Sequence, residues 1–166
     1  MTGTGFTDAA TWYAGLPVLY AGAAALITDA AGQVLLVKPN YRDHWTLPGG
    51  ICEHAEPPHA ACAREVREEL GLDLPVGRLL VIDWAPPDGE RPNPIMHFVF
   101  DGGTLAGPDG IVLQQEELDD YRFTDPAAVA DYLPPFIAPR IPAALTARAS
   151  GAAAYLPAAL GGTPFA

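Results

Sequence analysis

Residues 50–72 read GICEHAEPPHAACAREVREELGL, and acidic side chains are concentrated in the second half of this stretch. Glu65, Glu68 and Glu69 lie within a run of five residues. Because like charges this close repel one another, a folded protein needs a physical reason to keep them together. Their local structure decides whether the three carboxylates face one another or point apart.

The residues around the acidic run predict a helix over 57–71. Pro57 and Pro58 suit the first turn of a helix, and Gly71 suits the position just past its end. At about 100° per residue, the three glutamates fall within an arc of about 100°. A separate arc of similar width carries side chains suited to packing, namely Cys62, Ala63, Val66 and Leu70. The helix therefore has one stripe that packs and an adjacent stripe that is acidic.

A solvated surface helix is one explanation for the acidic stripe, and a bound divalent cation is another. Two observations favour the cation. Arg64 lies four residues before Glu68 and can pair with it, whereas Arg67 points elsewhere, so one cation faces three carboxylates. The helix also follows the turn at Gly49-Gly50, where backbone can approach a ligand closely. Carboxylate oxygens suit Mg²⁺ or Mn²⁺, which retain waters and accept phosphate oxygens as further ligands.

The composition of the whole chain limits its function further. The 166 residues, of which 49% are hydrophobic, suit a single domain, placed at 1–149, followed by an Ala/Gly-rich, loosely held tail at 150–166. A net charge of -11, with nine Lys and Arg scattered along the chain, disfavours binding to a nucleic acid polymer. Cys52 and Cys62 form no disulfide pattern, and reduced thiols suit a cytoplasmic protein. We find neither a secretory signal nor an apolar stretch long enough for a membrane span.

Hydrophobic patterns and turn residues predict an α+β fold with a mixed or antiparallel sheet, because strands and helices mix without regular βαβ alternation. A hairpin is expected at the start, with a turn at 29–32 between its strands. The predicted strands are 18–28, 33–39, 75–86, 94–102 and 110–125, the last ending in an acidic turn, and the predicted helices are 6–15, 57–71, 126–133 and 138–149.

The stretch with the glutamates resembles the signature of the Nudix hydrolases and matches that signature at every fixed position. The sequence WTLPGG at 45–50 also resembles the usual entry to this signature. Two departures are mild, because Ala55 stands where relatives often have Gly, and Pro57 where they often have Ser or Thr. The matching residues are Gly50, Glu56, Arg64, Glu65, Val66, Arg67, Glu68, Glu69, Leu70, Gly71 and Leu72.

The resemblance implies a Nudix fold, in which helices sandwich a mixed sheet and the signature forms a loop–helix–loop. It implies cleavage of a pyrophosphate linkage in a nucleoside diphosphate derivative, such as a nucleoside triphosphate or ADP-ribose, with Mg²⁺ or Mn²⁺. Glu65 and Glu69 would bind the metal, Glu68 would be a ligand or an orienting group, and the Gly49 carbonyl would be a further ligand. Arg64 would orient a glutamate of the signature, and Glu56 would have a structural role near the helix start.

The base that takes the proton of the attacking water is left open by the resemblance, since it belongs to the signature in some relatives and to a later loop in others. The later candidate lies in QQEELDDYRF at 114–123, where Glu117 fits best by its spacing before an aromatic residue and Glu116 comes second. A solvated acidic turn explains the same residues equally well.

Candidate substrate-binding residues are Lys38, Arg42 and Trp84. Lys38 ends a strand that leads toward the signature, and Trp84 is able to stack on a base, although aromatic residues also fill cores. The loop 85–95 is expected to decide the substrate. It holds Pro87, at a position where relatives that hydrolyse ADP-ribose resemble one another. A nucleoside triphosphate, a modified nucleotide or a phosphorylated metabolite without a nucleoside is just as compatible. His97 falls in a strand pattern and is interpreted as a core or half-buried histidine.

Two rival functions remain beside the hydrolase. A Nudix domain without catalytic activity would sense a nucleotide-like ligand, but such domains commonly carry a degraded signature, and this one is intact. An isomerase acting on a diphosphate would need further catalytic residues that the sequence does not reveal. A small-molecule diphosphate is the expected partner in each case, and relatives are commonly homodimers.

Overall fold

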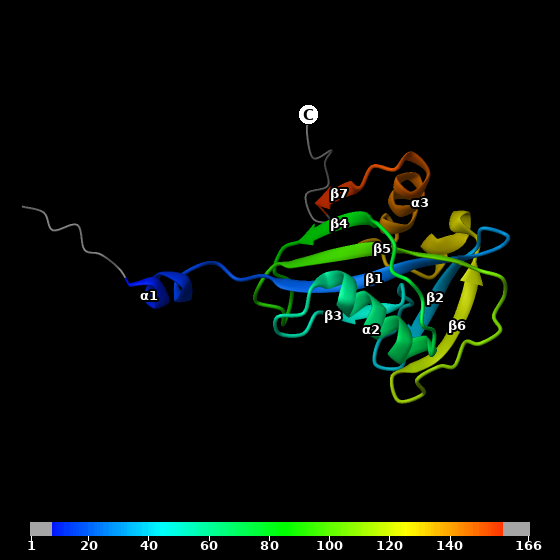
Figure 1. Cartoon of the computed structure of the whole chain (residues 1–166), viewed down its shortest axis with the longest axis horizontal. Coiled ribbons are helices and arrows are strands. Elements are labelled where there is room, and N and C mark those ends of the chain that lie inside the picture. Colours follow the sequence, from blue (N-terminus) through cyan, green and yellow to red (C-terminus); the bar gives the residue numbers. More distant parts are fainter. Residues whose placement is uncertain (1–7, 158–166) are drawn as a thin grey trace, which may run out of the picture.

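A seven-stranded mixed β-sheet lies at the centre of the computed structural model, which describes residues 8–157 (Figure 1). The sheet order is β6-β2-β1-β5-β4-β7, and β3 pairs with β1 beside that path. The β1–β5 and β4–β7 pairs are parallel and the others antiparallel, which confirms the α+β class with a mixed sheet. The elements are α1 (Ala9–Ala14), β1 (Tyr20–Asp29), β2 (Val34–Pro39), β3 (Gly49–Ile51), α2 (Pro58–Leu70), β4 (Leu79–Ala85), β5 (Ile95–Leu105), β6 (Leu118–Thr124), η1 (Pro126–Asp131), α3 (Arg140–Ser150) and β7 (Ala154–Pro157).

Both faces of the sheet are covered, and the central strands show it in their sequence. Residues 34–37 of β2 are four consecutive buried aliphatics. Because strand side chains alternate between faces, Val34 and Leu36 join one core cluster, while Leu35 and Val37 join the other. A continuous apolar run thus marks a strand buried on both sides.

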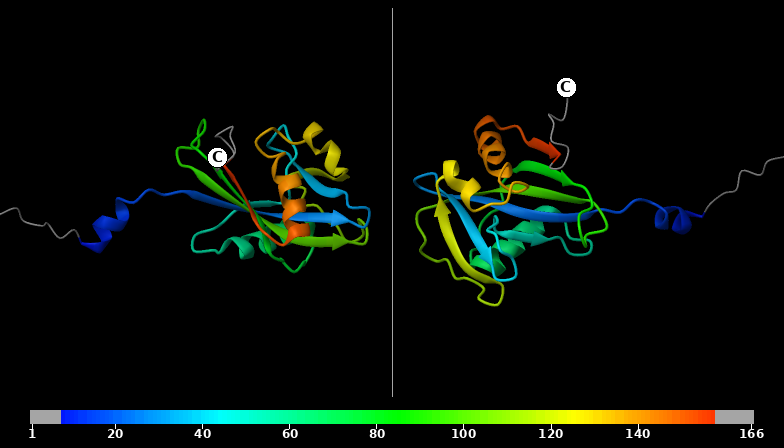
Figure 2. Two further views of the ribbon diagram at one scale, coloured as in Figure 1. Left: turned by 90° about the horizontal axis from the view of Figure 1, so that it is seen from above. Right: turned by 180° about the vertical axis from the view of Figure 1, so that it is seen from behind.

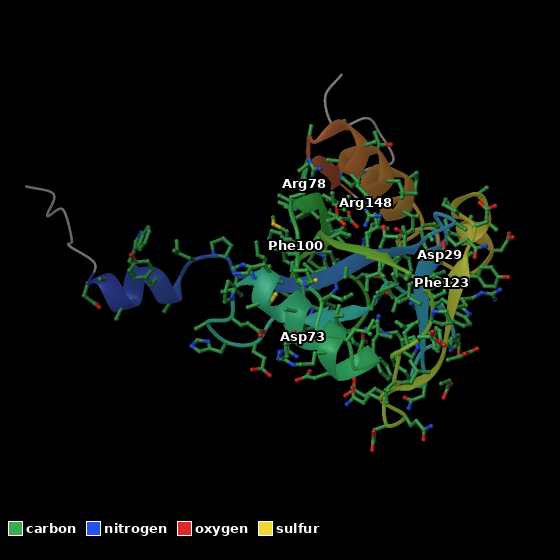
Figure 3. All side chains as sticks on the ribbon, turned by 45° about the vertical axis from the view of Figure 1, so that its right-hand side comes forward. Asp29, Asp73, Arg78, Phe100, Phe123 and Arg148 are labelled. Atoms are coloured by element: carbon green, nitrogen blue, oxygen red, sulfur yellow. The ribbon has the colours of Figure 1, made fainter. Side chains whose placement is uncertain are left out.

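The two helices that cover the sheet lie on opposite faces. Ala61, Cys62, Val66 and Leu70 of α2 pack into one cluster, and the buried residues of α3 pack into the other together with those of η1. Arg148 of α3 reaches toward the sheet (Figure 3), where its guanidinium donates to Asp101 Oδ1 at 2.7 Å. The predicted helix at 57–71 is thereby confirmed. Cys62, Val66 and Leu70 of its predicted packing stripe are buried, whereas Ala63 is half-buried and Ala61 packs in its place.

The N-terminal helix α1 stands apart from the sheet in both views of Figure 2. It is shorter than the predicted helix at 6–15, of which residues 6–7 lie outside the described residues, and none of its residues is buried. The predicted helix at 126–133 is a 3₁₀ helix, η1, which ends at Asp131. Within residues 8–157, no helix combines the length and the apolar character needed to cross a membrane.

The prediction of a strand over 110–125 is wrong for its first half, and the acidic residues lie before and within the strand instead of after it. β6 begins only at Leu118. The preceding segment is held by the end of α2, because Val112 N donates to the Leu70 carbonyl at 2.8 Å and Gln114 N donates to the Glu69 carbonyl at 3.1 Å. These bonds satisfy helix carbonyls that lack a partner within α2, so the segment is not free to pair in the sheet.

The prediction of a loosely held tail from residue 150 is wrong for residues 154–157. They form β7, the edge strand that pairs in parallel with β4, with Val81 opposite Ala154 and Trp84 opposite Pro157. Ala154 and Leu156 also pack against the α3 side of the core, so the alanine-rich composition hid a strand. Residues 158–166 of the predicted tail lie outside the described residues.

A chain ended after Ala153 is expected to be less stable than one ended after Pro157. The shorter chain lacks β7, and losing the burial of one Leu side chain costs about 2 kcal/mol. In a domain of this length that loss lowers Tm by roughly 4–8 °C. Thermal unfolding of both chains by circular dichroism measures the difference, and equal Tm values would show that β7 does not contribute to stability.

Candidate active site

The turn between β2 and α2 brings backbone closer to its neighbours than any side chain allows. Gly49 of β3 has φ 144°, and a Cβ there would overlap the Ala23 carbonyl oxygen of β1. A Cβ on Gly50 would overlap the Glu65 carboxylate of α2. A side chain on Gly49 is excluded by the β1 backbone, whereas one on Gly50 would force the Glu65 carboxylate to move. This close approach accompanies the pairing of the short strand β3 with β1.

Glu69 is the most deeply buried carboxylate of α2, with 4% of its surface exposed. Its Oε2 accepts a hydrogen bond from Gly49 N at 2.8 Å. Burial raises the pKa of Glu69 to about 8, and the charges of Glu65 and Glu117 act in the same direction, against the Gly49 bond. The acidic arc of α2 is therefore not a solvated stripe, because its innermost member is in the core.

Arg64 forms ion pairs with the other carboxylates of the signature. Its Nε lies 3.0 Å from Glu56 Oε1, and its Nη1 lies 2.9 Å from both Glu65 Oε1 and Glu68 Oε2. These contacts match the expected roles of Arg64 and Glu56 in holding the signature together. Arg64 thus pairs with three carboxylates, as expected, but the third is Glu56 and not Glu69.

A cavity of about 700 Å³ opens beside β1 and β3. Of the predicted site residues, Gly49, Glu65, Glu69, Glu117 and Arg42 line it. The structure brings neither Arg64 nor the exposed Glu68 to its surface, nor the two predicted substrate contacts Lys38 and Trp84. Loop 85–95 lines one side with Pro86, Pro87, Asp88 and Arg91. Its contact with the substrate stays a prediction.

Glu117 reaches the cavity from the turn before β6. The turn is tied to the end of β2, because Asn40 N donates to the Glu117 carbonyl at 2.9 Å and Asn40 Nδ2 donates to the Glu116 carbonyl at 2.8 Å. The side chain of Glu117 is exposed and faces Glu65 and Glu69, whose pKa values its charge raises. Glu116 does not line the cavity.

Lys38 and Trp84 lie elsewhere for reasons of local structure. The Lys38 ammonium donates to the carbonyls of Pro39 and Arg42, so it braces the chain after β2. Trp84 lies in β4 opposite Met96, one residue beyond Asp83, so it falls on the other face of the sheet from the one where Asp83 meets α3.

Sequence reasoning missed a group of cavity residues on the α3 face of the sheet. Asp83 of β4 is 1% exposed and accepts a hydrogen bond at 2.6 Å from Arg140 Nε, and Arg140 of α3 is 7% exposed and lines the cavity. His97 of β5 lies directly opposite Asp83 and also lines the cavity. Charged residues inside apolar patterns were the available signal, since Asp83 interrupts LLVIDWA and Arg140 precedes IPAAL.

The cavity carboxylates have the chemistry that the expected divalent cation requires, although they are not gathered around one point. Among residues 8–157, no group of three His, Cys, Asp or Glu side chains is already gathered closely enough to hold a metal ion. Glu65 and Glu69 nevertheless face one cavity together with Gly49, and burial raises the pKa of both carboxyls. All-oxygen donors and under-compensated negative charge fit a hard cation such as Mg²⁺.

Comparison with known proteins agrees with this geometry. The family model described as the NUDIX domain matches residues 19–144. The chain belongs to the Nudix family. The solved structure of a MutT protein from Methanosarcina mazei Go1 superposes with a TM-score of 0.67 at 22% identity, covering 80% of this chain and 96% of that one. This likeness confirms the Nudix fold.

Two curated relatives are similar to part of this Nudix domain. One is a protein of Bacillus subtilis (strain 168) whose name provisionally assigns it as an ADP-ribose pyrophosphatase, 33% identical over 40% of this chain and 32% of that protein. The other is diphosphoinositol polyphosphate phosphohydrolase 2 of Rattus norvegicus, 51% identical over 33% of this chain and 31% of that protein. The Nudix chain thus spans about a third of the length of each curated relative.

The Nudix signature also explains the unusual backbone at Ala55. Ala55 has φ 61°, in the left-handed region where a side chain costs about 1–2 kcal/mol relative to the right-handed form. Relatives with Gly at this position avoid that cost. Ala55 therefore makes this loop more strained than a glycine would.

Without divalent cations, the Nudix domain is expected to lose stability as the pH rises from 4.5 to about 8, the range between the ordinary and the folded pKa of Glu69. Folded Glu69 keeps its proton in this range while the unfolded chain has lost it, so folding takes up a proton. Tm should fall over this range, by about 2–4 °C for each kcal/mol lost in a domain of this length.

The measurement is a thermal melt in EDTA at a series of pH values, for the wild type and two variants. Glu69→Gln should flatten the decline, because the amide resembles a permanently protonated carboxyl. Glu68→Gln, a matched change of an exposed glutamate, should leave the decline in place. A wild-type slope that persists in Glu69→Gln would assign the effect to other groups.

Proposed function

We propose that this Nudix domain is a divalent-metal-dependent hydrolase that cleaves a pyrophosphate linkage in a nucleoside diphosphate derivative. The observation that carries the proposal is the convergence of Glu65, Glu69 and Glu117 on one cavity, although α2 and the turn before β6 are far apart in sequence. Concentrated, buried negative charge is unfavourable alone and becomes useful beside cations that also bind phosphate.

Gly49, Glu65 and Glu69 would hold Mg²⁺ or Mn²⁺, through the carbonyl of the first and the carboxylates of the others. The bound metal would polarise a phosphoryl oxygen and lower the pKa of a coordinated water. Glu68, half-exposed and paired with Arg64, is better suited to fix that arginine than to contact the diphosphate. Arg64 in turn holds the Glu65 carboxylate in place.

Glu117 is the general base in this proposal. Hydrolysis adds water across the P–O–P linkage, so a group beside the cavity has to accept the proton of the attacking water. Glu117 lines the cavity and is exposed, whereas Glu65 is paired with Arg64 and Glu69 with Gly49 N–H. Asn40 holds the backbone of Glu117 in place, so the flexible carboxylate side chain starts from a fixed position.

The rest of the cavity suits the organic part of a nucleotide. Its volume of about 700 Å³ falls in the range of small-ligand sites, and Tyr41, Phe136 and Ile137 supply apolar and aromatic surface. Pro87 lines the same space, which supports ADP-ribose and related sugar nucleotides as first candidates. The pyrophosphate linkage is thus the bond that is broken, and a substrate panel identifies the second moiety.

Phosphate release from a panel of nucleoside triphosphates, ADP-ribose, dinucleotides and sugar nucleotides tests the function. The panel runs with Mg²⁺ and with Mn²⁺, with and without added phosphatase. Hydrolysis of at least one compound that stops in EDTA is the expected result. Ligand-induced thermal stabilisation without hydrolysis of any compound would instead favour a sensor.

Glu69→Gln is expected to lower kcat on the best substrate by at least about a hundredfold while the protein stays folded. Loss of a group that only orients a metal ligand costs about 10–100-fold, and loss of a ligand should cost more. The change preserves shape, and a melt in EDTA checks the fold. Activity equal to the wild type would refute the assignment of Glu69 as a metal ligand.

Glu117→Gln is expected to lower kcat by about 10²–10⁴-fold, the usual contribution of a general base, with little change in KM. Glu116→Gln is the matched control, since its neighbouring carboxylate does not line the cavity. The pH–rate profile separates roles, because loss of a base removes the dependence of kcat on the ionisation of that group. If both variants keep full activity, the base belongs to the signature helix.

A further inference from the structure

Positive charge is gathered at one place in an otherwise acidic chain. The whole sequence has nine Lys and Arg and a net charge of -11. Arg42, Arg91 and Arg140 all line the cavity that the glutamates share. Arg42 is already a candidate contact for the substrate, whereas the proposed hydrolysis gives Arg91 and Arg140 no role. Their presence in the cavity needs a separate explanation.

Arg140 is the most informative of these cations. It is 7% exposed, and its guanidinium donates through Nε to Asp83 Oδ2 at 2.6 Å. Among the described residues, the hydrogen bonds of its side chain end there, so the two Nη groups remain unpaired beside the cavity. These Nη atoms are not among the buried side-chain atoms that lack a partner, so they are open to the cavity and free to donate to a ligand there.

Residues of three neighbouring strands hold Arg140 in place. Gly22 of β1, His97 of β5 and Asp83 of β4 lie side by side in register across three strands. The absence of a side chain on Gly22 makes room for the His97 ring, because a Cβ there would lie 2.9 Å from Nδ1. Asp83 then anchors Arg140 from the neighbouring strand. Rigid strands thus present an arginine and an imidazole to the same space.

Arg91 is held just as firmly from the loop 85–95. Its Nη2 donates to the Pro86 carbonyl at 2.6 Å and its Nη1 donates to the Asn93 carbonyl at 2.7 Å. Burial lowers the pKa of His97 to about 3, and the positive charges of Arg140, Arg91 and Arg42 lower it further. His97 is therefore neutral, and the nearby charges of Arg140, Arg91 and Arg42 favour an anion, which Asp88 on the same cavity wall opposes.

We infer that Arg140, Arg91 and His97 form a second anion-binding subsite, which recognises a phosphate or carboxylate group on the part of the substrate beyond the scissile diphosphate. This inference rests on the proposed function for its account of where the diphosphate lies. Arginine binds such groups through paired N–H donors, and Asp83 keeps the guanidinium of Arg140 oriented before the ligand arrives. The preferred substrates are thus diphosphates with an additional negative charge.

Matched substrate pairs test the preference. UDP-glucuronate differs from UDP-glucose by a carboxylate, and ADP-ribose 2′-phosphate differs from ADP-ribose by a phosphate, so the two pairs separate the two sources of charge. The wild type should favour the charged member of at least one pair by about tenfold in kcat/KM, the effect of one good charged hydrogen bond. Equal values within both pairs would overturn the inference.

Arg140→Lys should reduce that ratio to within about twofold, because a lysine can still pair with Asp83 but lacks the paired Nη donors. Arg78→Lys, the same change at an exposed arginine, should keep the wild-type ratio. If Arg140→Lys fails to fold, the double variant Asp83→Asn, Arg140→Gln replaces the ion pair by neutral amides. A preference that survives in these Arg140 variants would refute the subsite.

Binding of inorganic phosphate in EDTA tests the subsite without any hydrolysis. Without metal the glutamates repel phosphate, so any phosphate that binds should bind at the arginine subsite. Phosphate should therefore raise the Tm of the wild type and of Glu69→Gln, and it should not raise the Tm of Arg140→Lys. A wild type that hydrolyses no diphosphate but shows this shift would refute the proposed function and retain the subsite. No shift in the wild type, or an equal shift in Arg140→Lys, would refute the subsite.

Discussion

The close approach of β3 to β1 on one side and to α2 on the other is the constraint on which the site depends. Gly49 and Gly50 meet it by having no side chain, since a Cβ on the first would overlap β1 and a Cβ on the second would overlap Glu65. The pairing of β1 with β2 is confined to Thr28 and Val34, so the other end of β1 is free to pair with β3. The signature helix is thereby held with its carboxylates against the sheet.

Burial of Glu69 changes the ionisation of its carboxyl group. A carboxylate that is 4% exposed is unfavourable as an anion, and the single Gly49 N–H bond does not offset its burial, as the raised pKa of Glu69 indicates. Arg64 is already paired with Glu56, Glu65 and Glu68. Glu69 has no cationic partner among the described residues and lines the cavity, where a cation from solution can reach it.

The sequence predicts the parts of the site that are local and fails for those that are assembled. Pro58, Gly71 and the spacing of the glutamates determine α2 and the order of its carboxylates within one helix. The burial of Glu69 depends on β3, which has only three residues and no strand pattern of its own. The segment 110–117 looked like a strand, but its backbone N–H groups bond to the carboxyl end of α2, a contact that no local pattern encodes.

The acidic and the basic residues of the cavity are supplied by helices on opposite faces of the sheet. α2 lies on one face and brings carboxylates to the cavity past Gly50, whereas α3 lies on the other face and brings Arg140 over Asp83 and His97. A helix on each face thus supplies charge of one sign, and β1 with β3 separates the two. Because opposite charges at contact would neutralise one another, this separation is what lets one cavity hold a cation beside the glutamates and an anion beside the arginines.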